Sequence, residues 1–368
     1  MPSDPSPSRA ADSATTALIV GVDTHKHTHV AVAITRLGAR LAAHSAPATR
    51  EGYAALLGWA RRLGEVEAFA VEGTGSYGAG LASFLRRQAI HVVEVSHCDR
   101  RKRRKDGKND TLDAENAARS VLAGTATAVP KTADGTAEMV RQLKIARDTA
   151  VKARSAAIIA LKTLLVNAPG ELRETLEPLS DRLLLARCAQ LSVGAMHTPA
   201  AAVRHALRAL ALRWRVLTDE IATHDALLDT LTAAAVPTLR AAFGIGPDAA
   251  AEMLIVAGDN PARIRSDAAF AKLCGACPIP ASSGITHRHR IFRGGHRHAN
   301  AALYRIVIVR LRWHQPTIDY VARRTAQGLS KKDIIRCLKR FVAREVYRAL
   351  LADHAAREAA VEPALVAA

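Results

Sequence analysis

The chain has 368 residues, and its 52 Lys and Arg outnumber its 34 Asp and Glu to give a formal net charge of +18 at pH 7. A chain of this length accommodates two or three domains. Because 49 % of the residues are hydrophobic, it can bury sizeable cores, which excludes a mostly disordered protein. The basic excess favours a polyanionic partner such as nucleic acid. Since only 4 % of residues are aromatic, base stacking is not expected to be the main binding device.

The cysteines and the N-terminus indicate where the protein is expected to work. Five cysteines in a chain of this length make no disulfide framework, and their odd number fits a reducing compartment. Residues 1–16 are rich in Pro, Ser and Ala and lack the apolar core of a signal peptide, so a disordered tail is expected there. The sequence contains no run of about 18 apolar residues, so no membrane partner is expected. We therefore expect a cytoplasmic, nucleoid-associated protein.

The segment 17–131 alternates short apolar runs with amphipathic stretches. Three strands are expected first, at residues 17–23, 29–36 and 39–46. Two helices then alternate with two strands, at residues 49–64, 68–72, 78–88 and 91–95. A basic stretch at 97–108 precedes a last helix at 110–124. This order predicts an α/β domain with a mixed sheet, since the later apolar runs are typical of strands buried on both faces.

The segment 132–235 has no strand pattern and few Gly or Pro. Its stretches rich in Ala, Leu and Arg place apolar residues three and four positions apart, which predicts long helices. Both a plain helical bundle and an oligomerising coiled coil fit this pattern.

The segment 236–353 is also predicted to be mostly helical, and a tail follows at 354–368. It begins with two helical stretches joined by a tight turn that contains Gly244 and Gly246. Glycine amides in such a helix-hairpin-helix-like turn can approach a phosphate backbone, although a plain helical hairpin fits equally well. The last helix carries a basic face, which either solvent or phosphates would meet. This face consists of Lys331, Lys332, Arg336, Lys339, Arg340 and Arg344.

Four carboxylates lie where a hard metal ion is expected. Asp23 ends the first predicted strand, Glu72 ends a later buried strand, and Asp110 and Asp113 lie three positions apart on one helical face. A carboxylate at the end of a buried strand is unfavourable unless a cation compensates it. Two Mg²⁺ ions about 3.5–4 Å apart would bind the attacking and leaving oxygens of a phosphodiester displacement. Taken singly, each acid also fits a turn, cap or first-turn role.

Other residues near these acids are weaker candidates. Asp106 and Glu115 are possible substitutes in the acidic group. His25, His27 and His29 alternate beside the first acid and offer metal ligands, but we expect them to be exposed polar strand residues.

Four phrases of the sequence are specific in type and order. They are GVDTHK, VEGTGSYG, DGKNDTLDAENAAR and CPIPASSGITHRHRIFRGGHRHANAALYR. Together they resemble the IS110 family of insertion-sequence transposases, the DEDD/serine recombinases guided by a bridge RNA, over about residues 17–353. The resemblance implies an RNase H-like, RuvC-type N-terminal domain at 17–131, a coiled coil at 132–235 and a serine domain at 236–353. It also implies that Asp23, Glu72, Asp110 and Asp113 are the metal-binding catalytic acids.

The segment 274–300 carries the candidate nucleophile. Ser282 and Ser283 precede a glycine, and four Arg and four His follow within twelve residues. A hydroxyl needs a base, a metal or cations to act at neutral pH. By the resemblance, the nucleophile is Ser283, with Ser282 as the alternative. Phosphate contacts are expected from Arg288, Arg290, Arg293 and Arg297.

The same segment has a second, weaker interpretation. Cys274 and Cys277, spaced C-x-x-C, could bind zinc together with the nearby histidines. Elsewhere in the chain, further nucleic-acid contacts are expected from the basic stretch, the glycine turn and the last helix. These residues are Arg100, Arg101, Lys102, Arg103, Arg104, Lys105, Gly244, Gly246, Lys339 and Arg340.

These observations predict a site-specific DNA recombinase that moves its own insertion element with Mg²⁺ as cofactor. Its expected partners are element-end and target DNA and a guide (bridge) RNA. Because the serine is far from the acids in the sequence, a composite site and a homo-oligomer, a dimer or tetramer, are expected. Two alternatives remain: a RuvC-like, metal-dependent junction nuclease, and an inactive nucleic-acid-binding protein descended from a transposase.

Overall fold

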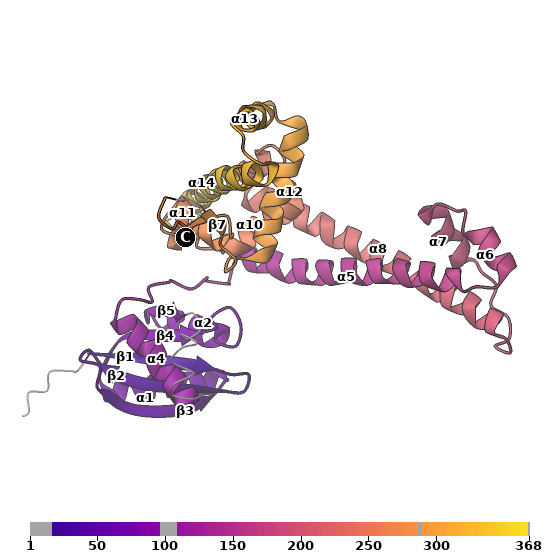
Figure 1. Cartoon of the computed structure of the whole chain (residues 1–368). Coiled ribbons are helices and arrows are strands. Elements are labelled where there is room, and N and C mark those ends of the chain that lie inside the picture. The colour runs from indigo at the N-terminus through magenta and orange to yellow at the C-terminus, as the bar shows by residue number, and fades with distance from the viewer. Residues whose placement is uncertain (1–16, 96–108, 286–288, 367–368) are drawn as a thin grey trace, which may run out of the picture. The chain divides into compact units, whose positions relative to one another are not determined.

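The computed structural model describes residues 17–95, 109–285 and 289–366 (Figure 1). The chain divides after Ala133 into two compact units, and we describe each unit by itself. The border between the predicted second and third segments falls inside the second unit. No helix in the described ranges is long and apolar enough to cross a membrane.

The first unit is built on a mixed five-stranded sheet of order β3-β2-β1-β4-β5. The strands are β1 (Ala17–Thr24), β2 (Thr28–Thr35), β3 (Arg40–Pro47), β4 (Glu65–Glu72) and β5 (Val92–Val95). The first three form an antiparallel meander, whereas β4 and β5 run parallel to β1. The predicted α/β architecture with a mixed sheet is confirmed, and every predicted strand of this segment is present.

Helices cover both faces of this sheet. On one face, α1 (Arg50–Leu63) and α2 (Ala79–Arg87) pack on the side chains of Leu18, Val20 and Val22. On the other face, α4 (Asp110–Leu122) packs against Ile19, the next position of the same strand. Because side chains alternate along a strand, the odd-numbered positions of β1 face α4.

In the second unit, two long helices form an arm. They are α5 (Thr136–Val166) and α8 (Pro199–Ala235), which lie side by side in Figure 1. At the far end, α6 (Gly170–Leu176) and α7 (Asp181–Ala189) close a small apolar core with them. The prediction of long helices without strands in 132–235 is confirmed.

The other end of the arm joins a helical body. Its elements are α9 (Pro237–Ala241), α10 (Pro247–Ala257), η1 (Pro261–Arg263), α11 (Asp267–Leu273), α12 (Arg297–Trp313), α13 (Gln315–Ala326) and α14 (Lys331–Val366). A two-stranded antiparallel ribbon, β6 (Pro278–Pro280) and β7 (His289–Ile291), stands out from it. No strand is predicted from the sequence in this segment. Three-residue strands with two prolines give no alternation signal.

Candidate functional site

The carboxylates of Asp23 and Glu72 lie at one edge of the sheet. Asp23 is the next-to-last residue of β1 and Glu72 is the last of β4, and the pairing of Val22 with Val71 brings the two acids abreast. Both residues occupy the strand positions that face α4, as Ile19 does on β1. They are buried, with 9 % and 7 % of their surface exposed. The two acids are therefore buried neighbours at this edge of the sheet.

The chain just beyond these strands fixes their ends together. The Thr24 hydroxyl donates a hydrogen bond of 2.9 Å to the backbone carbonyl of Glu72. After Glu72 the chain turns at Gly73, whose φ of +66° favours glycine. Thus the phrases GVDT and VEGT supply both an acid and the contact that aligns it.

The first turn of α4 brings two more acids to the same edge. The Asn109 side chain caps the helix by accepting a hydrogen bond of 3.0 Å from the Thr111 amide. Asp110 is the first helical residue and is partly exposed, whereas Asp113, one turn on, is only 4 % exposed. Their three-residue spacing turns both toward the sheet side of the helix.

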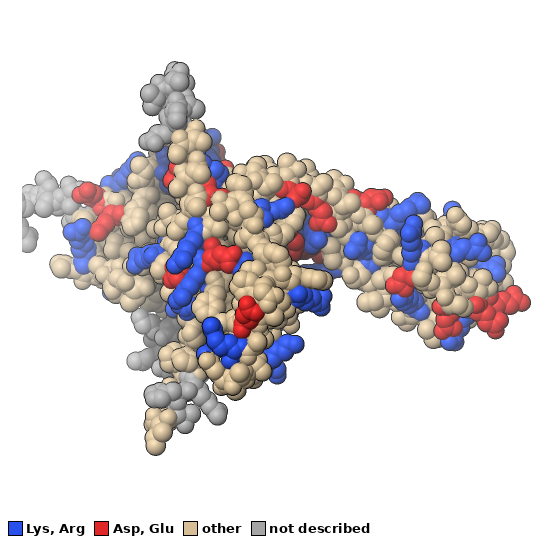
Figure 2. All heavy atoms as spheres, turned by 90° about the horizontal axis from the view of Figure 1, so that it is seen from above, with Lys and Arg blue, Asp and Glu red and all other residues tan. Residues whose placement is uncertain are grey.

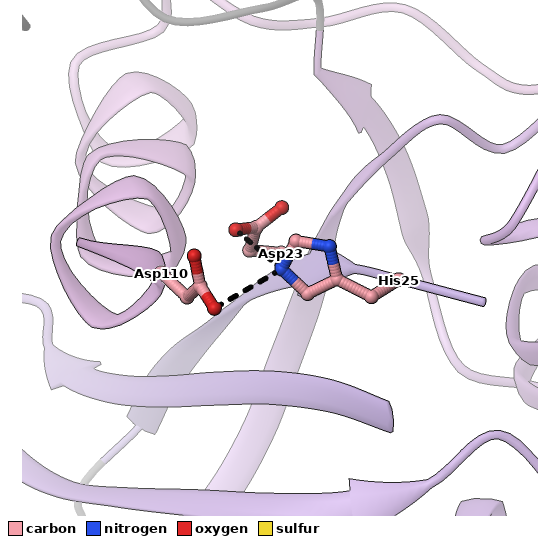
Figure 3. Close-up of side chains that lie close together, drawn as sticks. All are labelled: Asp23, His25 and Asp110. Atoms are coloured by element: carbon pink, nitrogen blue, oxygen red, sulfur yellow. Dashed lines mark ion pairs between the residues drawn. The ribbon is translucent and has the colours of Figure 1, made fainter. Parts of the chain in front are cut away.

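His25 lies among these carboxylates. Its Nε2 is 3.4 Å from Asp23 Oδ2 and 3.2 Å from Asp110 Oδ2, as Figure 3 shows. One ligand atom from each of the three residues falls within 4.8 Å of the other two. The prediction that His25 is a strand residue is wrong, because β1 ends at Thr24, whereas its side chain is 44 % exposed. The only sequence signal was its place two residues after Asp23.

Burial and the neighbouring charges both act on the pKa of Asp23. Burial raises the pKa of Asp23 above its usual value; the nearby His25 lowers it, while the charges of Glu72, Asp110 and Asp113 raise it further. The four acids thus share one electrostatic site. A cation would relieve both the desolvation and the repulsion, and a set of carboxylate oxygens with one imidazole suits a divalent ion.

Of the weaker candidates, Glu115 and His29 make other contacts. Glu115 pairs with Arg119 at 2.7 Å and with Arg40 at 3.7 Å, and Asp106 lies outside the described residues. His27 is exposed as predicted, but it lies in the turn between β1 and β2 and not in a strand. His29 lies in β2 as predicted but is fully buried and stacks on Tyr53, so its predicted exposure is wrong. His29 belongs to the opposite face of the sheet, with α1.

The two serines lie in the second unit. Ser282 and Ser283 are exposed in the connection between β6 and β7, followed by Gly284 with a φ of +54°. Asn300 fixes the base of this ribbon through its Nδ2, which donates to the carbonyls of Cys274 and Gly275 at 3.0 and 2.8 Å. The candidate nucleophile is therefore carried on a short, anchored β-ribbon.

The predicted phosphate-binding arginines of this segment are distributed around the ribbon. Arg290 lies in β7, Arg293 in the following turn and Arg297 at the start of α12, and all three are exposed. Arg288 and the basic stretch Arg100–Lys105 lie outside the described residues.

The remaining predicted contacts lie in the helical body. Gly244 has a φ of +77°, and Gly246 caps α10 with open space where a side chain would begin. Lys339 and Arg340 are half-buried on α14, and Lys339 Nζ donates to Asn300 Oδ1 at 2.7 Å. The last helix therefore contacts the residue that anchors the serine ribbon.

The zinc interpretation gains little from the structure. Cys274 is buried, and burial raises the pKa of its thiol to about 12, which disfavours the thiolate that binds zinc. Within the described ranges, the groups of side chains close enough to hold a metal contain no cysteine. They are the group of Asp23 and a second one formed by Asp148, Glu252 and His298.

Comparison with known families covers both units. Residues 20–168, which include all four acids, match the model of DEDD transposases of IS110 type. Residues 236–322, which include both serines, match the model of the IS116/IS110/IS902 family of transposases. A search of curated proteins gave no match. The two family matches together cover more than half of the chain and point to a DNA-processing enzyme, and the DEDD match points to divalent metal use. The chain belongs to the IS110 family of transposases.

Proposed function

We propose that this transposase is a site-specific DNA recombinase of an insertion sequence, which cuts and rejoins DNA through Ser283 with the help of Mg²⁺ held by Asp23, Glu72, Asp110 and Asp113. The observation that carries the proposal is the convergence of these acids from β1, β4 and α4 on one edge of the sheet, where three of the four are buried. The strand order and the acids at the ends of two parallel strands support the RNase H-like, RuvC-type interpretation of this unit.

The acids and His25 make the metal site. Asp23 and Asp110 offer oxygens on either side of the imidazole of His25, which adds a nitrogen donor to the carboxylate set. A bound Mg²⁺ would polarise a phosphate oxygen and stabilise the charge that develops on it. Because the raised pKa of Asp23 reflects burial and crowding of like charges, metal binding should displace protons from the site.

Ser283 supplies the covalent step. Its Oγ attacks the phosphorus of a DNA phosphodiester, an O–P bond to the serine forms, and the bond from phosphorus to the departing strand breaks. The serine gives up its proton and the departing oxygen takes one up. Attack by a strand hydroxyl on the phosphoserine reverses the sequence and rejoins DNA. The exposed position of Ser283 in the connection of a ribbon whose second strand carries the exposed Arg290 supports this role.

The partners follow from the family and from the charge. Lys and Arg gather in several groups on the face seen in Figure 2, including on the arm, with acidic residues between them. Such a surface suits phosphate backbones at several places. We propose that a guide RNA pairs with DNA and leaves shape and backbone recognition to the protein. We also propose a homo-oligomer, a dimer or tetramer, which light scattering of the purified protein would measure.

The test is a search for a covalent intermediate. The protein is expressed with RNA from the flanking DNA of its element and mixed with labelled element-end and target DNA and Mg²⁺. Products are separated under denaturing conditions for wild type, Ser283→Ala, Ser282→Ala and Asp23→Asn. The Ser282→Ala protein is the matched control, since it removes the adjacent hydroxyl.

We expect a protein–DNA adduct with wild type and Ser282→Ala, and none with the other two variants. Cleavage without an adduct, abolished by Asp23→Asn but insensitive to Ser283→Ala, would instead support a metal-dependent nuclease. Binding of DNA and RNA without cleavage under any metal condition would support an inactive binding protein.

A further inference from the structure

A cleft of about 680 Å³ lies between the serine ribbon and the helices α13 and α14. Pro278 of β6 and Arg290 and Ile291 of β7 form one wall, so the strands that flank Ser283 also line the cleft. A volume of this size falls within the range of about 300–1,000 Å³ that is typical of small-molecule sites. It has room for a nucleotide or two, but not for a duplex.

The walls of the cleft are strongly basic. Arg323 and Arg324 come from α13, while Arg336, Lys339, Arg340 and Arg344 come from α14. Asp333 is the one carboxylate among the described residues that line the cleft. The cleft therefore presents an excess of positive charge to whatever enters it.

Few of these cations are neutralised by the protein. Arg336 pairs with Asp333 at 2.6 Å, and Arg344 pairs with Asp267 at 2.9 Å. Among the described residues, the other cations of the cleft have no carboxylate within ion-pair distance. The Nε of Arg324 is buried without a hydrogen-bond acceptor in that same part of the chain. Burial, and then the charge of Arg336, lower the pKa of Lys339. A bound anion would neutralise the unpaired cations, accept a hydrogen bond from the Arg324 Nε and stabilise the charged form of Lys339.

Aromatic side chains lie among the cations. Phe341 is 48 % exposed although it is a large apolar residue on a helix that packs on the core, and Tyr320 meets it edge to face at 5.5 Å. The guanidinium of Arg323 lies 5.4 Å from the Tyr320 ring centroid. An open aromatic ring inside a basic groove combines a surface for base stacking with donors for phosphates.

We propose that this cleft holds unpaired DNA nucleotides next to the Ser283 ribbon, with a base against Phe341 and the backbone phosphates between the arginines. In a duplex the faces of the bases are stacked on one another, so only an unpaired nucleotide can present a base to Phe341. The choice of DNA rests on the proposed function, because the strand that Ser283 attacks continues past the same ribbon. Arg323 and Arg324 thereby join the predicted contacts as residues that position this strand, together with Arg344 of the basic face of the last helix.

The test measures binding without cleavage. The full-length Ser283→Ala protein is titrated with a fluorescent single-stranded DNA, a blunt duplex of the same sequence and the corresponding RNA, over a series of salt concentrations. Two cleft variants, Phe341→Leu and Arg340→Gln, are added to this background. The matched control is Arg61→Gln, which removes the same charge from an exposed position on α1 of the first unit. Thermal melting confirms that each variant is folded.

The two cleft variants should differ in their salt dependence. Phe341→Leu keeps an apolar side chain but loses the ring, so affinity for single-stranded DNA should fall about tenfold with an unchanged salt slope. Arg340→Gln should weaken binding and also flatten the slope of log K against log salt by about 0.7, the value for one phosphate contact on a single strand. Arg61→Gln should bind like the background protein.

The proposal is overturned if the two cleft variants are folded and bind single-stranded DNA like the background protein. It is also overturned if both variants weaken binding of the duplex, or of RNA, more than binding of single-stranded DNA. Failure of the proposed function gives a different pattern: wild type then forms no adduct, while the dependence of strand binding on Phe341 persists.

Discussion

Gly21 determines how closely α4 approaches the sheet. A Cβ built at this position on β1 would lie 1.9 Å from the backbone oxygen of Ala114 and 2.6 Å from the backbone nitrogen of Ala118. Both atoms belong to the backbone of α4, so no side-chain rotation relieves the overlap. In Gly21→Ala the helix must withdraw by about 1.5 Å to reach an ordinary contact distance. Asp110 and Asp113 would move with it, away from Asp23.

The expected effects have two magnitudes. Forcing a methyl group into this packed interface should lower the free energy of unfolding by about 1–3 kcal/mol. A displacement of about 1 Å at a reacting centre can lower the rate about 100-fold, so adduct formation should fall by this factor while the protein remains folded. Metal affinity should fall too, because the α4 acids no longer meet those of the strands.

The assay compares Gly21→Ala with Gly58→Ala. Gly58 lies on α1 in the same unit, and a Cβ there would meet only the end of the Arg62 side chain at 3.6 Å. Unfolding in urea gives the stability, calorimetry with Mg²⁺ gives the affinity, and adduct yield gives the activity. If folded Gly21→Ala binds Mg²⁺ and forms adduct like wild type, the acids of α4 are not part of the site and the reasoning fails.

Three further predictions concern the second unit. Lys144 is buried, and its Nζ lies 2.8–3.1 Å from three carboxylates, including the buried Glu252. Lys144→Met should therefore lower the free energy of unfolding by about 3 kcal/mol, and adding Glu252→Gln should restore part of this loss. The control is Lys152→Met at an exposed position, and an equal loss there would refute the role of burial. Asp353 is 2 % exposed and accepts two hydrogen bonds, of 2.9 and 3.1 Å, from backbone amides in the first turn of α9. Asp353→Ala should therefore lower the free energy of unfolding, measured by urea titration, by about 2 kcal/mol. A loss of less than half this amount would contradict the prediction. Burial raises the pKa of Asp248, but Lys144, Arg305 and Arg147 outweigh it and hold the pKa below its usual value. The resulting stability is present above the unfolded pKa and is lost as the pH falls through the lower folded pKa. In wild type, but not in Asp248→Asn, a component of the unfolding free energy should therefore be lost progressively as the pH falls below about 5.

The strands and the acids could be predicted because their signals are local. A short apolar run that ends in an acid predicts both the strand and the buried carboxylate, as at Asp23 and Glu72. The three-residue spacing of Asp110 and Asp113 predicts a shared helical face. All four were found from the sequence with no knowledge of what lies between them in space.

The rest of the site depends on contacts between distant segments. His25 meets Asp110 only because Gly21 allows α4 to lie against β1, and nothing near His25 in the sequence shows this. The two very short strands beside Ser283 have no alternation to detect. Arg323 gave no signal of its own, because its partners in the cleft come from α14 and the ribbon.

The most direct measurement of the central claim is the identity of the residue joined to DNA. The adduct formed by wild type with Mg²⁺ is digested with protease and nuclease, and mass spectrometry locates the nucleotide that remains attached. The account predicts a nucleotide on Ser283 and no such peptide from Asp23→Asn. A nucleotide on another residue, or efficient strand cleavage with none attached, would contradict it.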